Sequence, residues 1–400
     1  MDYSVCGDRV RLANSEGIRP AMASPKAVRL VCRVCLLILI SAGVLSLPAR
    51  PQTADTFASL VSSADAARQQ GDIPTAIALY RKAVEQNPNW PDGWWFLGIL
   101  QYDANQYVPA RDALNRYLQL TPDAAPALAL RGLCEFNTGE YLQSLEDLEL
   151  GVSRGAANQP KNARILFYHE ALLLLRLGRF EESLGKFTLL AKQGTDNQDL
   201  AMGIGLAGLR MNVLPADAPA AQAQMLSSIG QAALLLMNEN YDGGRAAFQA
   251  LFAQYPHSPD IHYLYGYLIF ATKPEEAVEQ FRKELEISPQ SANAHAMCAW
   301  TLEFQGDYAA ALAEAAKASA EDPSLPMGQL VYGRALVETG DSSGGLPHLE
   351  SVLQTEPGNL EAHLTLAKAY SKLGRSEEAR RERLLCLSIS QQGAPAVAVP

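Results

Sequence analysis

The amino-acid sequence predicts an all-α fold, a right-handed α-solenoid of stacked helix–turn–helix units with one irregular helix in the middle. In both halves of the chain prolines recur every 33 or 34 residues, and glycines recur at 34 residues or twice that distance. A fixed period of this size is typical of stacked copies of one small unit rather than of a single globular core. The prolines are Pro88, Pro122, Pro256, Pro289, Pro323 and Pro357, and the glycines are Gly71, Gly139, Gly306, Gly340 and Gly374.

The first unit, residues 57–88, is expected to contain two helices. Gly71 follows the first apolar face, and a glycine just past a helix adopts the left-handed conformation at little steric cost. Pro88 ends the second helix, because the α conformation is disfavoured for the residue before a proline. Residues three and four apart form the apolar faces. These are Leu60, Ala64 and Ala67 in the first helix, and Ala76, Tyr80, Ala83 and Val84 in the second.

The same template fits most of the chain. Three units are expected over residues 57–153, and residues 154–224 are expected to hold one unit, a linker and the irregular helix. That helix is placed at Leu200 to Met211, before a proline-flanked loop at 215–219. Five further units are expected over 225–388. Residues 389–400 contain glycine, proline and small residues, and are expected to form a disordered tail.

The units resemble the tetratricopeptide repeat (TPR) family. They have small residues where the two helices approach, an aromatic residue in the second helix and a closing proline, as in Gly266, Ala277, Phe281 and Pro289. The resemblance extends over about residues 55–388 in nine copies. It implies a protein that binds other proteins, is not an enzyme and needs no cofactor.

In this family the first helix of each unit lines a concave groove, so outward-facing side chains of these helices are candidate partner-binding residues. Most of them here are aromatic or aliphatic, and large aromatic side chains contribute strongly to interfaces. Such a groove is expected to hold an extended or helical peptide segment of another protein. The alternative is that superhelical stacking, or the extra helix at Leu200 to Met211, covers these rings. The candidates are Trp95, Ile99, Tyr102, Phe136, Tyr168, Leu172, Tyr263, Tyr267, Phe270 and Trp300.

The last unit is more charged than the others. Terminal repeats need a polar outer face for solubility. We therefore interpret its basic residues as a polar cap. These are Lys368, Lys372, Arg380, Arg381 and Arg383.

The N-terminal segment, residues 1–49, resembles an export signal. Three basic residues precede an apolar run at 34–47, and Ala49 offers a small residue for cleavage. The run is shorter than the roughly 20 residues of a transmembrane helix. We expect a periplasmic or secreted protein whose translation starts at Met1 or Met22; the alternative is an uncleaved anchor that faces the periplasm. The basic residues are Lys26, Arg29 and Arg33.

The net charge argues against a nucleic-acid binder, and the cysteine content argues against a disulfide-stabilised fold. The net charge of −10 is the opposite of the basic surface that a nucleic-acid binder needs. Beyond the N-terminal segment, only Cys134, Cys298 and Cys386 remain. An odd and scattered set does not make a disulfide framework, so we expect them to be buried as small apolar residues.

Two motifs have the spacing of catalytic or cofactor sites without the expected context. Gly203 to Gly208 matches a dinucleotide fingerprint but lacks the preceding strand, so we expect close helix packing. Gly340 to Gly344 matches a nucleophile elbow but falls at the turn between two helices. His169-Glu170 begins a zinc-protease pattern that lacks its second histidine, and no metal site is expected.

The sequence therefore predicts an exported, non-enzymatic interaction scaffold. The alternative is a chaperone-like assembly factor for envelope or secreted proteins, which would bind many unfolded clients weakly. No nucleic-acid partner is expected, and membrane contact is expected only through an uncleaved N-terminal segment. Selective binding of one folded partner would distinguish the scaffold from the chaperone.

Overall fold

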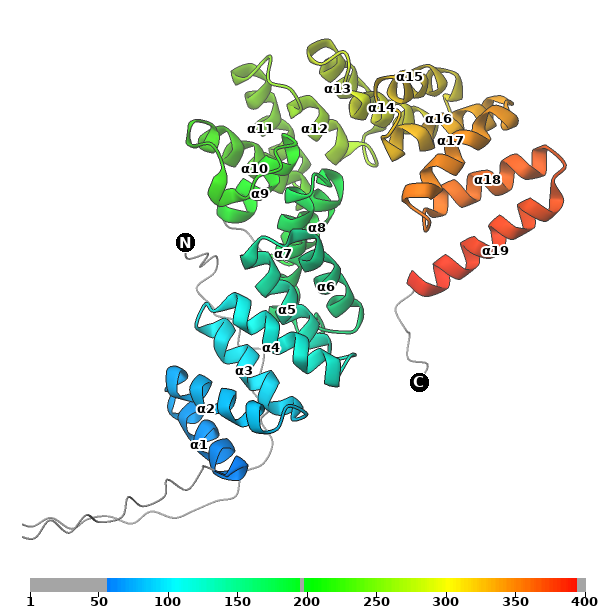
Figure 1. The fold of residues 1–400 in the computed structure, drawn as a ribbon. Coiled ribbons are helices and arrows are strands. Elements are labelled where there is room, and N and C mark those ends of the chain that lie inside the picture. The colour runs from blue at the N-terminus through cyan, green and yellow to red at the C-terminus, as the bar shows by residue number, and fades with distance from the viewer. Residues whose placement is uncertain (1–55, 195–197, 394–400) are drawn as a thin grey trace, which may run out of the picture. The chain divides into compact units, whose positions relative to one another are not determined.

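The computed structural model describes residues 56–194 and 198–393, and within these ranges every regular element is a helix (Figure 1). The predicted all-α solenoid of stacked helix pairs is confirmed. The chain divides into two compact units, the first ending at Ala163 and the second beginning at Arg164.

In the first unit, consecutive helices form antiparallel pairs, and each pair packs against the next through α2 with α3 and α4 with α5. Ala64 and Ala76, the small residues expected at the closest approach of the first pair, are fully buried. The helices are α1 (Phe57–Gln70), α2 (Ile73–Gln86), α3 (Pro91–Asp103), α4 (Tyr107–Leu120), α5 (Ala125–Thr138) and α6 (Tyr141–Ser153).

The second unit continues the same pairing, with a break after α8 (Phe180–Lys192), which follows α7 (Pro160–Arg176). The helices of the break are α9 (Gln198–Gly208), α10 (Ala223–Met237) and α11 (Tyr241–Gln254). Regular pairs resume with α12 (Ile261–Ile269), α13 (Pro274–Ile287), α14 (Ala292–Phe304), α15 (Tyr308–Glu321), α16 (Pro326–Thr339), α17 (Ser342–Thr355), α18 (Leu360–Lys372) and α19 (Ser376–Gly393).

Glycine followed by aspartate makes the turn within several pairs. Gly71 and Gly340 have φ angles of 77° and 109°, a left-handed conformation in which a side chain would be strained. The next residue caps the second helix: Asp72 accepts a hydrogen bond from the Thr75 amide and Asp341 from the Gly344 amide, at 3.2 and 2.8 Å. The Gly340–Gly344 motif is therefore a turn and a helix cap, as the sequence predicted.

The glycines of the dinucleotide-like motif all lie at helix contacts in α9. A Cβ atom on Gly203 or Gly208 would lie 2.6 Å from the Phe187 ring or 2.4 Å from Leu264. A Cβ atom on Gly205 would lie 2.1 Å from the backbone oxygen of Leu226 in α10. This confirms the expected close helix packing. In addition to its contact with α11, α10 packs extensively against α9.

The C-terminal tail was predicted wrongly at its start. Residues 389–393 continue α19 rather than form disordered chain, because Gln391 and Gln392 favour helix and no proline occurs before Pro395. The expected export signal at 1–49 and residues 394–400 lie outside the described ranges. Within those ranges, no helix combines the length and apolarity needed to cross a bilayer.

Candidate functional site

The ten candidate groove residues have different environments. Phe136, Leu172 and Tyr263 are buried, with 6%, 6% and 3% of their surface exposed, so a partner cannot reach them without a rearrangement. For these three, packing inside the stack replaces the expected partner contact. The other seven are half-buried: Trp95, Ile99, Tyr102, Tyr168, Tyr267, Phe270 and Trp300.

Tyr263 of α12 contacts residues of the irregular central segment and of α8. Its hydroxyl donates a hydrogen bond of 2.7 Å to Glu181 at the start of α8, and the Tyr267 hydroxyl donates to the backbone oxygen of Glu181 at 3.4 Å. Arg210, which follows α9, pairs with the same carboxylate and lies 5.5 Å from the centre of the Tyr263 ring. The sequence could not indicate this role, since Glu181 precedes these tyrosines by more than 80 residues.

The candidates on α3 in the first unit also pack against neighbouring helices. Trp95 contacts Tyr117, with ring centres 5.4 Å apart, and Tyr102 meets Tyr107 edge to face at 5.6 Å. Ile99 packs, like these aromatic residues, against a core cluster of buried side chains from α4 and α5. Burial raises the pKa of the Tyr102 hydroxyl. This surface is therefore a partly covered aromatic layer rather than an open groove.

The second unit presents a more accessible surface on α14, α16 and α18, each the first helix of its pair. These helices contact one another directly, α14 with α16 and α16 with α18. The 34-residue period aligns equivalent positions of these helices in two rows. We call this surface the α14–α16–α18 face. Its rows are Trp300, Arg334 and Lys368, and Phe304, Glu338 and Lys372.

Ion pairs hold the side chains of the α14–α16–α18 face. The Arg334 guanidinium lies 4.4 Å from the centre of the Trp300 ring and pairs with Glu303 at 3.2 Å and Glu361 at 3.3 Å. The Lys368 ammonium donates hydrogen bonds of 2.5 and 2.6 Å to Glu338. Burial raises the pKa of Glu303 to about 7, a shift that Arg334 opposes. The sequence predicted an apolar groove, whereas charged and aromatic side chains share this face.

Phe304 was missed as a candidate. It is the last residue of α14, one helical turn after Trp300, and 66% of its surface is exposed. The i, i+4 spacing from Trp300 places both side chains on one side of the helix, so the sequence did contain the signal. A large exposed aromatic residue beside a second ring is a common feature of protein-binding surfaces.

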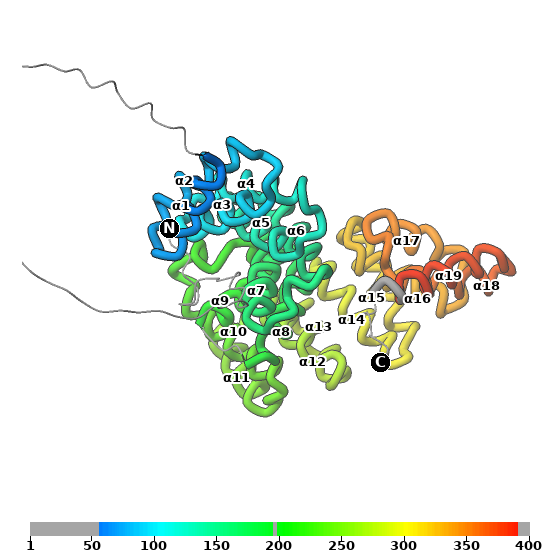
Figure 2. The backbone as a smooth tube through the Cα atoms, turned by 90° about the horizontal axis from the view of Figure 1, so that it is seen from below, coloured from blue at the N-terminus to red at the C-terminus, as the bar shows by residue number. Residues whose placement is uncertain are grey.

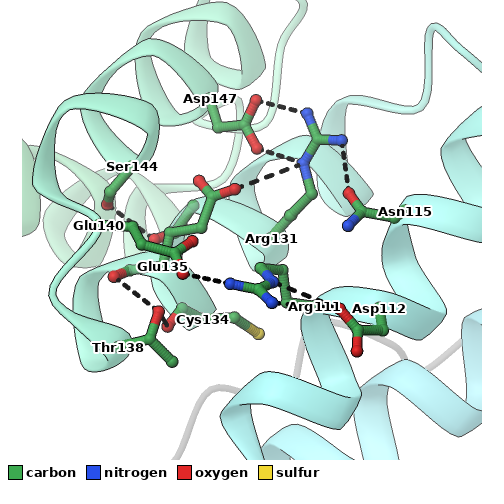
Figure 3. A network of polar contacts seen from close by, with 11 residues as sticks. Arg111, Asp112, Asn115, Arg131, Cys134, Glu135, Thr138, Glu140, Ser144 and Asp147 are labelled. Atoms are coloured by element: carbon green, nitrogen blue, oxygen red, sulfur yellow. Dashed lines mark hydrogen bonds and ion pairs between the residues drawn. The ribbon is translucent and has the colours of Figure 1, made fainter.

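A polar network joins α4, α5 and α6 in the first unit (Figure 3). Arg131 makes two hydrogen bonds to Asp147, one of them 2.6 Å long, and a third to Asn115 at 3.0 Å. Glu135 lies beside this pair, with a carboxylate oxygen 4.0 Å from the guanidinium. Arg111 pairs with Glu140. Arg131 of α5 contacts α6 through Asp147 and α4 through Asn115, so the network holds these three helices together.

The pair Arg131–Asp147 has a charge-reversed counterpart in the second unit. Glu170 of α7 and Lys186 of α8 form an ion pair, and in both cases the partners are 16 residues apart. Glu170 is fully buried. The same two positions of a helix pair therefore carry an ion pair in either orientation, which supports a structural role.

Glu135 makes stability depend on pH. Burial, and next the Asp147 charge, raise the pKa of this carboxyl to about 7. The folded state then binds more protons than the unfolded state between about pH 4.5 and 7, so stability falls as the pH rises through this window. We expect Glu135→Gln to show a smaller fall. Urea unfolding from about pH 5 to 8 tests this, and equal slopes for both proteins would contradict it.

His169 and the three cysteines beyond the N-terminal segment have the following surroundings in the described residues. His169 contacts the backbone oxygen of Ile165 at 2.8 Å, and the described residues include no group of three His, Cys, Asp or Glu side chains able to hold a metal ion. The three cysteines are buried and unpaired, as expected. Burial raises the pKa of the Cys298 thiol to about 12, which disfavours the reactive thiolate.

Comparisons with known proteins agree with the repeat architecture. Three sequence models of the tetratricopeptide repeat match the chain, the first at residues 62–125 and 229–292, the second at 292–317 and the third at 336–382. The Protein CTR9 homolog of Arabidopsis thaliana is 23% identical over 316 residues, 76% of this chain and 26% of that protein. The PEX5-related protein of Homo sapiens is 32% identical over 81 residues, 20% of this chain and 13% of that protein.

These relatives are much longer than the parts matched, since the chain spans about a quarter of the first and less of the second. Among solved structures, MamA is 18% identical with a TM-score of 0.36, covering 40% of this chain and 93% of that one. YrrB, described as a TPR protein with an unusual peptide-binding site, is 17% identical with a TM-score of 0.36, covering 42% of this chain and 87% of that one.

Proposed function

Because this chain belongs to the tetratricopeptide repeat family, whose members mediate protein–protein interactions, we propose that it is an exported scaffold that binds a peptide segment of a partner protein. The proposed site is the α14–α16–α18 face. The observation that supports this choice is the exposed Phe304, one helical turn after the half-buried Trp300. Burying an aromatic side chain at an interface is among the larger favourable contributions to binding.

The partner segment is expected to place an apolar side chain against Phe304 and Trp300. Arg334 is already held by two carboxylates and the Trp300 ring. This pre-organised arrangement reduces the entropy that binding must remove. Along the rest of the face, Lys368 and Glu338 offer a donor and an acceptor to the backbone or polar side chains of the segment.

Export is the second part of the proposal. It is supported by the basic residues and apolar run that precede Ala49. Mass spectrometry of the protein isolated from its native cells tests it. A mature N-terminus near Ala49 in the periplasmic or secreted fraction is expected, whereas an intact N-terminus in the membrane fraction would indicate an anchor.

Replacing Phe304 with alanine is expected to weaken peptide binding by about tenfold or more, because an exposed aromatic anchor is lost while the core is untouched. Peptides selected from a random library against the full chain provide the ligands, and fluorescence anisotropy measures affinity. Leu189→Ala in α8, where leucine is 48% exposed, is the matched control. Equal affinities for the two variants would remove the face from the proposal. Weak binding of many unrelated unfolded proteins would favour the chaperone alternative.

A further inference from the structure

The last helix, α19, has an exposed apolar surface. It packs along α18 at the end of the array (Figures 1 and 2). Ala379 and Cys386 are buried. Leu384 and Leu387 are exposed, at 57% and 59% of their surface, and Arg380 and Arg381 are exposed as well. The helical period places these four residues within about 120° of one another around the axis. We call these four residues the outer face of α19. The polar cap expected from the sequence is therefore only partly polar.

Equivalent positions in the preceding unit are contact positions. Thirty-four residues before Arg380 and Leu387 lie Leu346 and Leu353 of α17. Both pack against a core cluster that includes residues of α18. The outer face of α19 thus corresponds to the surface on which, one unit earlier, the next first helix stacks. In a repeat array, this surface of one unit is covered by a helix of the next unit.

Two arginines give this surface its charge preference. Arg375 pairs with Glu378, and Arg383 donates a hydrogen bond to Ser371 at 2.6 Å. Within the described residues, Arg380 and Arg381 form no hydrogen bond or ion pair, although the Arg381 charge is one of the causes that lower the pKa of Glu378. The exposed Glu377 precedes them by one helical turn, so the two arginines leave this surface with an excess of one positive charge. They favour an acidic partner, while the charge of −10 on the whole chain disfavours an anionic membrane.

We propose that the outer face of α19 binds an amphipathic helix of a partner protein, with acidic residues beside its apolar stripe. The apolar stripe packs on Leu384 and Leu387, as a further first helix would. The acidic residues pair with Arg380 and Arg381. This site is separate from the α14–α16–α18 face, so either can be correct without the other.

Designed helical peptides test the proposal with the full chain. The first peptide carries a leucine stripe flanked by glutamates; the second has lysines in place of the glutamates; the third has the composition of the first with its leucines scattered around the helix. Fluorescence anisotropy is expected to show binding of the first and at least about tenfold weaker binding of the other two. Two double variants are each expected to bind the first peptide about tenfold more weakly. These are Leu384→Ser with Leu387→Ser, and Arg380→Glu with Arg381→Glu.

Leu142→Ser in α6 is the matched control, because that leucine is 54% exposed and lies on another helix. All substitutions are at exposed positions, and circular dichroism verifies that helix content is retained. Equal binding of the glutamate and lysine peptides would overturn the proposal, as would an unchanged affinity in the arginine variant. Binding to anionic vesicles without peptide binding, or self-association that the leucine variant abolishes without peptide binding, would assign the surface to a membrane or to a second copy.

Discussion

Replacing Asp147 with alanine is expected to lower the free energy of unfolding by about 3 kcal/mol, because it leaves the Arg131 charge in the helix interface without its partner. The Asp147 side chain is 10% exposed and that of Arg131 23%, so water compensates little. The Asn115 oxygen, 3.0 Å from the guanidinium, would be its remaining close acceptor apart from the more distant Glu135. Urea unfolding, with hydrogen exchange of the α5 and α6 amides, measures the loss.

A surface pair provides the control. Asp123 pairs with Arg154 at 2.9 Å, but its side chain is 86% exposed, so Asp123→Ala should cost at most about 0.5 kcal/mol. A triple variant, Arg131→Glu with Asp147→Lys and Glu135→Leu, copies the arrangement of Glu170, Lys186 and Leu174. It should recover most of the loss. Equal stabilities for the two single variants, or no recovery in the triple variant, would contradict the structural role of the pair.

Replacing Gly230 with alanine is expected to destabilise the second unit by about 3 kcal/mol, at the upper end of the usual cost of overpacking. The added Cβ atom would lie 1.8 Å from the backbone oxygen of Ala201. Relief of this clash requires α9 and α10 to move apart, since a backbone atom cannot rotate away. We expect faster hydrogen exchange in both helices.

A second glycine gives the opposite prediction. Gly185 lies in α8, is exposed, and would place a Cβ atom in open space. Gly185→Ala should therefore stabilise the protein by about 1 kcal/mol through helix propensity. Thermal unfolding of the two variants side by side tests the contrast. A Gly230→Ala variant as stable as the parent would show that α9 and α10 do not approach as closely as described.

The sequence was most informative where the structure depends on local chemistry. Gly71 and Asp72 could be assigned to a turn because left-handed backbone and helix capping are properties of neighbouring residues. The burial of Ala64 and Ala76 followed from their spacing on helices of known period. An extra helix was predicted at Leu200 to Met211, and the structure has α9 at Gln198–Gly208.

The sequence was less informative where a side chain meets a distant partner. Tyr263 has the position of a groove residue, yet its partner Glu181 lies on a helix of an earlier pair. In the pairing of α9 with α10, Gly205 lies against Leu226 and Gly230 against Ala201, and neither approach is visible in one helix alone. Phe304 and the leucines of α19 are exposed but were not among the predicted binding residues.

Site-specific photo-crosslinking in the native cells tests the central claim, that the α14–α16–α18 face binds a partner protein, most directly. A photoreactive amino acid placed at Phe304 is compared with one at Leu189, an exposed position on α8. We predict one dominant crosslinked protein at position 304, with a single peptide segment identified by mass spectrometry, and none of it at position 189. Crosslinks to the same proteins at both positions, or none at position 304, would contradict the claim.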